Sequence, residues 1–444
     1  MIGRYREMLF SIEDFRASLS KGFLNPLNLG YDFVDPSKFE NLFDTFGRES
    51  KHIKSLSVFD ELSQRMSKKY FQAVFLAQLR ALHFASRRFP AYSIIMPEDL
   101  AEDWLATVDF HKNFSRDHSL HQPLTAYVVA KLLGYGDERR SFRVPAGCGN
   151  LLGLCTDSII LRNQYLQHYA LAEGLPESLF HNQVLARCFW KDMFYKTAIM
   201  SALFHDIGYP WQYVGRINDS LKMCSPLLHP NDSISSFILK EMGDRLSFLP
   251  FHKYVYGPQV MAIGERQETE QLIKLALDTH GLPGAIAFLS LHDAIKASHS
   301  LSPLSHIQSF SIEWAALGIL MHDMVHIQQK NVLHSLRIDF QKDPLSSIVS
   351  MADFIEEFNR PNVSFSSFYK WSQASFGNAC SNVKVEISAD AVFQVKMRYN
   401  SEGAAALAGR SKAKETEEYF NLSSGFIDLS SIGVRDFSFI YETL

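Results

Sequence analysis

A histidine and an aspartate stand next to each other at the end of a long apolar segment, and this pair constrains the fold more than any other feature of the chain. The segment Tyr195 to Phe204 has the apolar spacing of a buried helix, and His205 and Asp206 follow it directly. A Gly-Tyr-Pro sequence at residues 208–210 then interrupts the helical pattern. A helix end that carries an imidazole and a carboxylate on consecutive residues lets both side chains reach one divalent cation. The pair therefore predicts a metal site within a helical framework.

Further residues of the types that bind metals lie before and after this pair, on other segments with helical spacing. His118 and His121 lie upstream and share one face of a helix, while His280, His322 and Asp353 lie downstream. The order along the chain is therefore histidine, His-Asp pair, histidine, histidine and aspartate. This order resembles the HD-domain superfamily of metal-dependent phosphohydrolases, and the resemblance covers residues 101–360.

The resemblance implies a ligand set and a catalytic metal. The implied metal ligands are His121, His205, Asp206, His280, His322 and Asp353. We prefer His121 to His118 as the first ligand because the apolar pattern that begins at Leu124 continues its helix, and His118 is then a catalytic candidate behind the ligands. Nitrogen and oxygen ligands together suit Mn, Fe, Mg, Ni or Co, and Zn is also compatible. If His280 and His322 both bind, the site holds two ions bridged by Asp206; otherwise it holds one.

Tyr209 is the candidate proton donor. It stands three residues after Asp206, where the phosphodiesterase branch of the family commonly has a lysine that protonates the leaving oxygen. A phenol has a reference pKa of about 10, close to that of a lysine, so Tyr209 could donate a proton or pack as an ordinary aromatic residue. The deoxynucleotide triphosphohydrolase branch usually has another histidine soon after its His-Asp pair, which this chain lacks, so neither branch fits cleanly.

Arginines and one tryptophan near these motifs are candidates for binding substrate. The candidate phosphate-binding residues are Arg116, Arg216 and Arg360. A guanidinium group matches two phosphate oxygens at once, although a solvated surface position is the common alternative for any single arginine. Trp211 could stack on a nucleotide base, and core packing explains it equally well.

The composition of the chain limits the kinds of ligand that we expect it to bind. The 444 residues include no apolar run of membrane-spanning length, and the net charge of -4 with no cluster of basic residues argues against long nucleic acid as a ligand. The five cysteines are scattered and contain no metal-knuckle spacing, which fits a reducing cytoplasm. We therefore expect a cytoplasmic protein that binds a small nucleotide and no membrane.

The predicted fold class is mainly α, an HD-type helical bundle with appended regions. Helical spacing is clearest over Leu124 to Leu133, Tyr195 to Phe204, Glu313 to Gln328 and Pro344 to Phe358. Asp343-Pro344 predicts the start of the last of these helices. The domains that we expect are a helical N-terminal region at 1–100, which could serve as an oligomer surface, the HD-type domain at 101–360 and a small α+β module at 361–444.

The C-terminal module shows a change of pattern. Apolar and polar residues alternate over Val383 to Ile387 and again over Phe393 to Tyr399, which predicts a hairpin. A helical segment, Ala404 to Phe420, and another alternating run, Val434 to Ile440, follow. The predicted order is therefore ββαβ.

The function that these features predict is metal-dependent hydrolysis of a phosphate ester or anhydride in a nucleotide, of the phosphodiesterase or the deoxynucleotide phosphohydrolase type. The alternative is a sensor that binds a nucleotide in the same pocket without turnover. A purely structural helical protein is the third hypothesis, and it leaves the ordered series of metal-binding residue types unexplained.

Overall fold

The structure is a computed structural model, and the parts of the chain that it describes are residues 7–20, 118–134, 140–146, 149–162, 167, 171, 183–206, 208, 280–286, 288–289, 306–324, 337–358, 380–421, 423 and 425–444. The chain divides into two compact units. The first unit comprises Met1–Leu152, Ala352–Gly425 and Leu429–Leu444, and the second comprises Gly153–Met351 and Phe426–Asp428.

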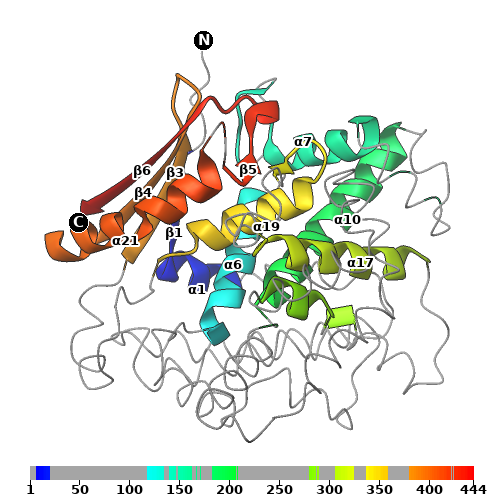
Figure 1. The fold of residues 1–444 in the computed structure, drawn as a ribbon. Helices are drawn as coiled ribbons and strands as arrows, with labels where there is room; N and C mark the ends of the chain where they lie inside the picture. The colour runs from blue at the N-terminus through cyan, green and yellow to red at the C-terminus, as the bar shows by residue number, and fades with distance from the viewer. Residues whose placement is uncertain are drawn as a thin grey trace, which may run out of the picture. The chain divides into compact units, whose positions relative to one another are not determined.

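A four-stranded mixed sheet forms the centre of the first unit. Its strands are β1 (Met8–Ser11), β3 (Cys380–Ile387), β4 (Val392–Tyr399) and β6 (Asp436–Thr443), in the order β1-β3-β4-β6 (Figure 1). Strands β1, β3 and β4 pair antiparallel, whereas β4 and β6 pair parallel. The parallel pair needs a crossover, which helix α21 (Glu402–Phe420) provides.

The alternating pattern of the sequence explains the two faces of this sheet. Val383 and Val395 are buried, while Lys384, Glu386 and Lys396 point to the opposite, partly exposed face. On that face the Glu386 carboxylate accepts from Lys396 Nζ at 2.6 Å and from Lys384 Nζ at 3.1 Å. These two ammonium groups hold the pKa of Glu386 below its usual range. Ion pairs within β3 and between β3 and β4 thus stabilise the partly exposed face.

Helix α21 covers the apolar face beside β4 and β6. Its N-terminus is capped by Ser401, whose Oγ accepts from the Ala404 N–H at 3.2 Å. At its other end the Phe420 ring packs on Phe437 and Phe439, each at a centroid distance of 5.1 Å. The predicted ββαβ order is confirmed for β3, β4, α21 and β6, and one further short strand, β5 (Ile427–Asp428), lies between α21 and β6.

The prediction of a mainly α fold is wrong. The described residues contain the four-stranded mixed sheet and a second, two-stranded sheet of β2 (Ile338–Asp339) and β5 (Ile427–Asp428), so helices and sheets share the fold. The sheet also takes strand β1 from the N-terminal region that we expected to be helical, and only then does helix α1 (Ile12–Ser20) begin. The sequence did not reveal β1 for two reasons. Four residues are too few for a period-2 pattern to stand out, and the strand with which β1 pairs, β3, lies far away along the chain.

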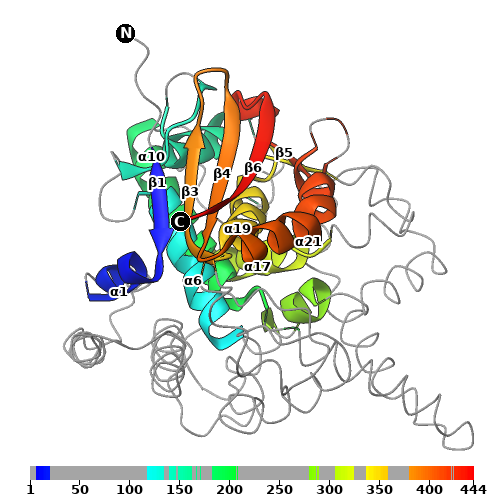
Figure 2. The ribbon, with the colours of Figure 1, turned by 90° about the vertical axis from the view of Figure 1, so that its left-hand side faces the viewer.

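Helix α6 (His118–Leu132) belongs to the same unit as this sheet (Figure 2). Its Tyr127 ring is fully buried and meets Phe10 of β1 and Phe15 of α1 edge to face, at centroid distances of 6.1 Å and 5.5 Å. These contacts anchor the N-terminal strand and helix on α6. The helix predicted from Leu124 to Leu133 is confirmed.

The second unit is mainly helical. Its longest helices, α10 (Gln183–Phe204) and α17 (His306–Met321), pack through Trp190 and Trp314, whose ring centroids are 6.1 Å apart. A short helix, α7 (Leu151–Asp157), leads into a turn of π-helix at Ser158–Arg162. The predicted helices in these regions are confirmed, although α17 ends at Met321 because residues 322–324 form a turn.

Helix α19 (Pro344–Ile355) begins in the second unit and ends in the first. The Asp343 carboxylate accepts from the Ser346 N–H at 3.0 Å, so Asp343 caps the helix and Pro344 occupies its first turn, as predicted. The three predicted domains stay a prediction. No helix among the described residues combines the length and apolarity needed to cross a membrane.

Candidate metal centre

Three helix ends of the second unit carry the residues of a buried histidine and carboxylate cluster. His205 and Asp206 follow the last residue of α10, His322 follows the last residue of α17, and His280 immediately precedes a helical turn at residues 281–286. All four side chains are buried. The helix end that the sequence predicted at His205 and Asp206 therefore lies beside His280 and His322 within this unit.

Two glycines allow these helix ends to approach each other. A Cβ on Gly208 would lie 1.9 Å from the His280 carbonyl oxygen, and a Cβ on Gly281 would lie 2.7 Å from the Leu320 carbonyl oxygen. Both contacts are far inside van der Waals distance, so no other residue fits at either position. The backbone beside the His-Asp pair is thereby held against the backbone that carries His280.

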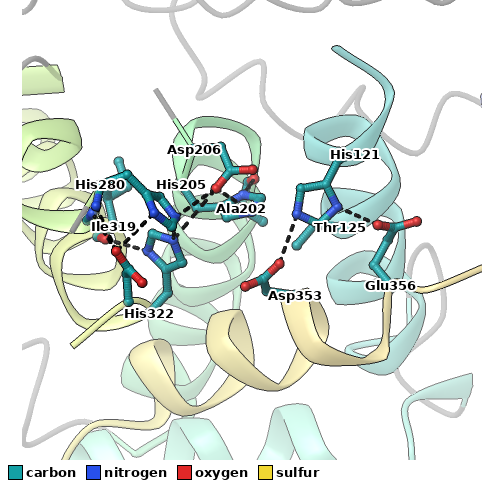
Figure 3. A network of polar contacts seen from close by, with 12 residues as sticks. His121, Thr125, Ala202, His205, Asp206, His280, Ile319, His322, Asp353 and Glu356 are labelled. Carbon is teal, nitrogen blue, oxygen red and sulfur yellow. Dashed lines mark hydrogen bonds and ion pairs between the residues drawn. The ribbon is translucent and has the colours of Figure 1, made fainter. Parts of the chain in front are cut away.

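The side chains of His280 and His322 converge on Asp206 (Figure 3). Asp206 Oδ1 lies 3.0 Å from His280 Nε2 and 3.8 Å from His322 Nε2, and the two Nε2 atoms are 2.9 Å apart. His205 Nε2 faces the same oxygen at 3.4 Å. Three ring nitrogens thus surround one carboxylate oxygen.

The opposite nitrogens of His205 and His322 are fixed by the same device. The Nδ1–H of His205 donates to the Ala202 carbonyl at 2.7 Å, and the Nδ1–H of His322 donates to the Ile319 carbonyl at 2.6 Å. Both carbonyls lie in the last turn of a helix, where the backbone leaves acceptors unused. A proton on Nδ1 leaves a lone pair on Nε2, so both rings present an electron pair to the cluster.

His280 is held by a second carboxylate, Asp323. Its Nδ1 lies 2.9 Å from Asp323 Oδ2, and its Nε2 faces Asp206. Burial alone lowers the pKa of His280, but the charges and hydrogen bonds of Asp323 and Asp206 outweigh it and raise the pKa to about 10. The protein therefore stabilises a positive charge at this point, and that charge is a proton when no cation is bound.

The composition and geometry of the cluster fit a metal ion. Asp206, His280 and His322 each offer one ligand atom, and the three atoms lie within 4.8 Å of one another. Each of these residues is at most 9% exposed. Buried carboxylates and imidazoles are a common ligand set for divalent transition metals, and here the tautomers of two rings are already set for it. These buried groups could hold a metal ion.

A second cluster, built around His121, belongs to the first unit. Its Nε2 is 2.9 Å from Asp353 Oδ1, and its Nδ1 forms a short hydrogen bond with Glu356 Oε2 (Figure 3). Asp353 and Glu356 lie three residues apart at the end of α19, so both carboxylates reach the same ring. The imidazole is thus enclosed by a carboxylate on each side.

Sequence reasoning missed Asp323 and Glu356. Asp323 follows His322 in another His-Asp dipeptide, which is a visible signal, but the motif assigned a role only to the histidine. Glu356 had no signal, because its partner is 235 residues away along the chain. Both contacts depend on tertiary structure.

The side chains of the remaining predicted site residues lie outside the part of the chain that the structure describes. Helix α6 starts at His118, but its side chain is outside the described residues. The other predicted residues outside the described part of the chain are Tyr209, Trp211, Arg116, Arg216 and Arg360. Their predicted roles stay predictions, as does the inclusion of His121 and Asp353 in the metal ligand set.

Comparison with known proteins identifies no family for this chain. No protein-family model matches the chain, and searches of curated proteins and of solved structures found no match. The resemblance to the HD-domain superfamily therefore rests on the order of residues in the sequence, while the buried cluster in the second unit is compatible with it.

Proposed function

We propose that the protein is a metal-dependent phosphohydrolase of the HD type, acting on a phosphate ester or anhydride bond of a nucleotide. The observation that carries the proposal is the convergence of three histidine Nε2 atoms on Asp206 Oδ1. With His205 and His322 holding their protons on Nδ1, both rings present the lone pair of Nε2 beside Asp206 Oδ1. A divalent cation accepts lone pairs of this kind.

The ligand types favour a catalytic rather than a purely structural metal. Structural zinc sites are closed by four protein ligands, commonly cysteines, whereas catalytic sites use fewer protein ligands of the histidine and carboxylate kind. Here Asp206, His280 and His322 form the group, and the His280 side chain keeps 11% of its surface exposed. When bound, a divalent ion supplies Lewis-acid chemistry, which activates water and neutralises phosphoryl oxygens.

The protein residues have defined tasks in this proposal. His205 and His322 are oriented by the carbonyls of their own helices, so they are ready to bind without rotating. Asp206 presents one oxygen to all the rings and is the group able to bridge two ions. The nucleotide as substrate follows from the resemblance in sequence and from the absence of basic clusters for longer nucleic acids.

The test is a metal analysis followed by a product screen. Purified protein is analysed for bound metal, loaded with Mn²⁺ and incubated with cyclic nucleotides, dinucleotides and nucleoside triphosphates, while released phosphate and products are measured. We expect turnover with at least one class, and its loss in Asp206→Asn. Asp343→Asn is the matched control, because Asp343 is also buried in the second unit but caps a helix.

Two results contradict the proposal. A protein that binds no divalent metal has no metal-dependent activity of any kind. A metal-loaded protein that binds a nucleotide without converting it is a sensor, which is the alternative hypothesis.

A further inference from the structure

Asp323 is a buried carboxylate beside the metal cluster, and one of its oxygens accepts three times. Oδ2 lies 2.9 Å from His280 Nδ1, 2.7 Å from the His280 backbone nitrogen and 3.3 Å from the Gly281 backbone nitrogen. The residue is only 2% exposed. A single oxygen therefore binds both the ring and the backbone of the same histidine.

This arrangement restricts His280 in two ways. The hydrogen bond to the ring keeps a proton on Nδ1 and so directs Nε2 to Asp206 Oδ1, 3.0 Å away. The hydrogen bonds from the His280 and Gly281 N–H groups fix the backbone position of His280. Hydrogen bonds of this kind, to a charged acceptor in a buried site, are stronger than those between neutral groups.

The two His-Asp pairs that the structure describes in the second unit, His205-Asp206 and His322-Asp323, consequently have different roles. In the pair formed by His205 and Asp206, the carboxylate faces the three ring nitrogens. In the pair formed by His322 and Asp323, the His322 ring faces Asp206 and the carboxylate turns to His280. The same dipeptide thus supplies a ligand carboxylate at one helix end and a supporting carboxylate at the other.

We propose that Asp323 is a positioning residue that orients His280 for metal binding. The inference rests on the proposed metal site in the second unit and adds to it the group that sets the direction and tautomer of one ligand. A carboxylate that binds the far nitrogen of a metal-bound histidine commonly changes metal affinity by about 10–100-fold.

Graded substitutions separate this role from simple packing. In Asp323→Asn the amide oxygen still accepts from the backbone N–H groups but lacks the negative charge, so we expect affinity for Mn²⁺ to fall about tenfold. In Asp323→Ala the ring and the backbone of His280 both lose their acceptor, and we expect a loss of about 100-fold. Asp343→Asn, in the helix cap of α19, is the control with unchanged affinity.

The measurements are calorimetric titration of the full chain with Mn²⁺ and the absorption spectrum of the Co²⁺-loaded protein. The spectrum reports ligand geometry around the ion, so a change in Asp323→Asn at an unchanged thermal midpoint indicates positioning rather than unfolding. If Asp323→Ala fails to fold, the Asn variant alone decides, because it retains the size and the acceptor oxygen.

The outcomes distinguish this inference from the proposed function. Wild-type protein that binds neither Mn²⁺ nor Co²⁺ overturns both. Wild-type protein that binds them, together with an Asp323→Asn variant of wild-type affinity and spectrum, overturns the role of Asp323 and leaves the metal site standing. A graded loss from Asn to Ala, with the control unaffected, supports the inference.

Discussion

The two histidine clusters contain the same residue types but differ in how rings and carboxylates are arranged. In the first unit one imidazole, His121, lies between the carboxylates of Asp353 and Glu356, one at each ring nitrogen. In the second unit the Nε2 atoms of three rings face a single oxygen of Asp206, and the pKa of His280 is raised to about 10 by Asp323 and Asp206.

This difference teaches that burial and residue type alone do not identify a metal site. We expect His121, which lies between two carboxylates, to contribute to folding. The metal site that we propose is instead centred on Asp206 Oδ1, which three ring nitrogens face. We therefore expect substitutions in the two clusters to affect different properties.

The largest expected effect is on metal retention and hydrolysis in the second unit. Asp206→Ala and His205→Ala should abolish both while the helical fold remains, because they remove the central oxygen or a pre-oriented ring without emptying the apolar core. Metal content, phosphate release and far-UV circular dichroism check this. A variant that keeps its metal and its activity breaks the distinction between the clusters.

The next largest effect is on folding, in the first unit. His121→Ala should destabilise the metal-free protein by about 3–5 kcal/mol, because it removes the ring that faces the fully buried Glu356 carboxylate. Urea denaturation in the presence of a chelator measures this loss. Replacing both His121 and Glu356 with leucine should recover much of the lost stability, since apolar side chains leave no buried charge. A loss below about 1 kcal/mol for the single variant contradicts a structural ion pair.

Removal of the metal should destabilise the wild-type protein by a smaller amount. An ion present at 100 times its dissociation constant stabilises the folded state by about 2.7 kcal/mol, so a chelator should lower the thermal midpoint accordingly. Asp206→Ala is the control that we expect to show no response to the chelator. Equal responses in the two proteins would place the bound ion outside the Asp206 cluster.

The smallest effect tests whether the first unit also contributes to metal binding. The sequence pattern includes Asp353 in the ligand set, and on that basis Asp353→Asn should weaken Mn²⁺ binding about tenfold, or about 1.4 kcal/mol. Calorimetric titration beside the Asp343→Asn control measures it. Unchanged affinity would show that the His121 cluster is structural only, which would sharpen the comparison.

Local patterns in the sequence predicted those parts of the fold that depend on neighbouring residues. The alternation in β3 and β4, the helical spacing of α10 and the cap of α19 at Asp343 are confirmed because period and capping act over a few residues. Strand β1 was missed, and with it the extent of the sheet, because its pairing with β3 joins the two ends of the chain.

The sequence by itself determined the order of the metal-binding residue types and the helix end that carries His205 and Asp206, because an apolar helix that stops at a polar pair is a local property. Only the tertiary structure decided what each carboxylate does. Asp206 and Asp323 stand in identical dipeptides, yet one faces three ring nitrogens and the other holds His280 from 43 residues away. The direction of a carboxylate depends on which helix ends pack against it, and that packing is set by long-range contacts such as the close approach at Gly208.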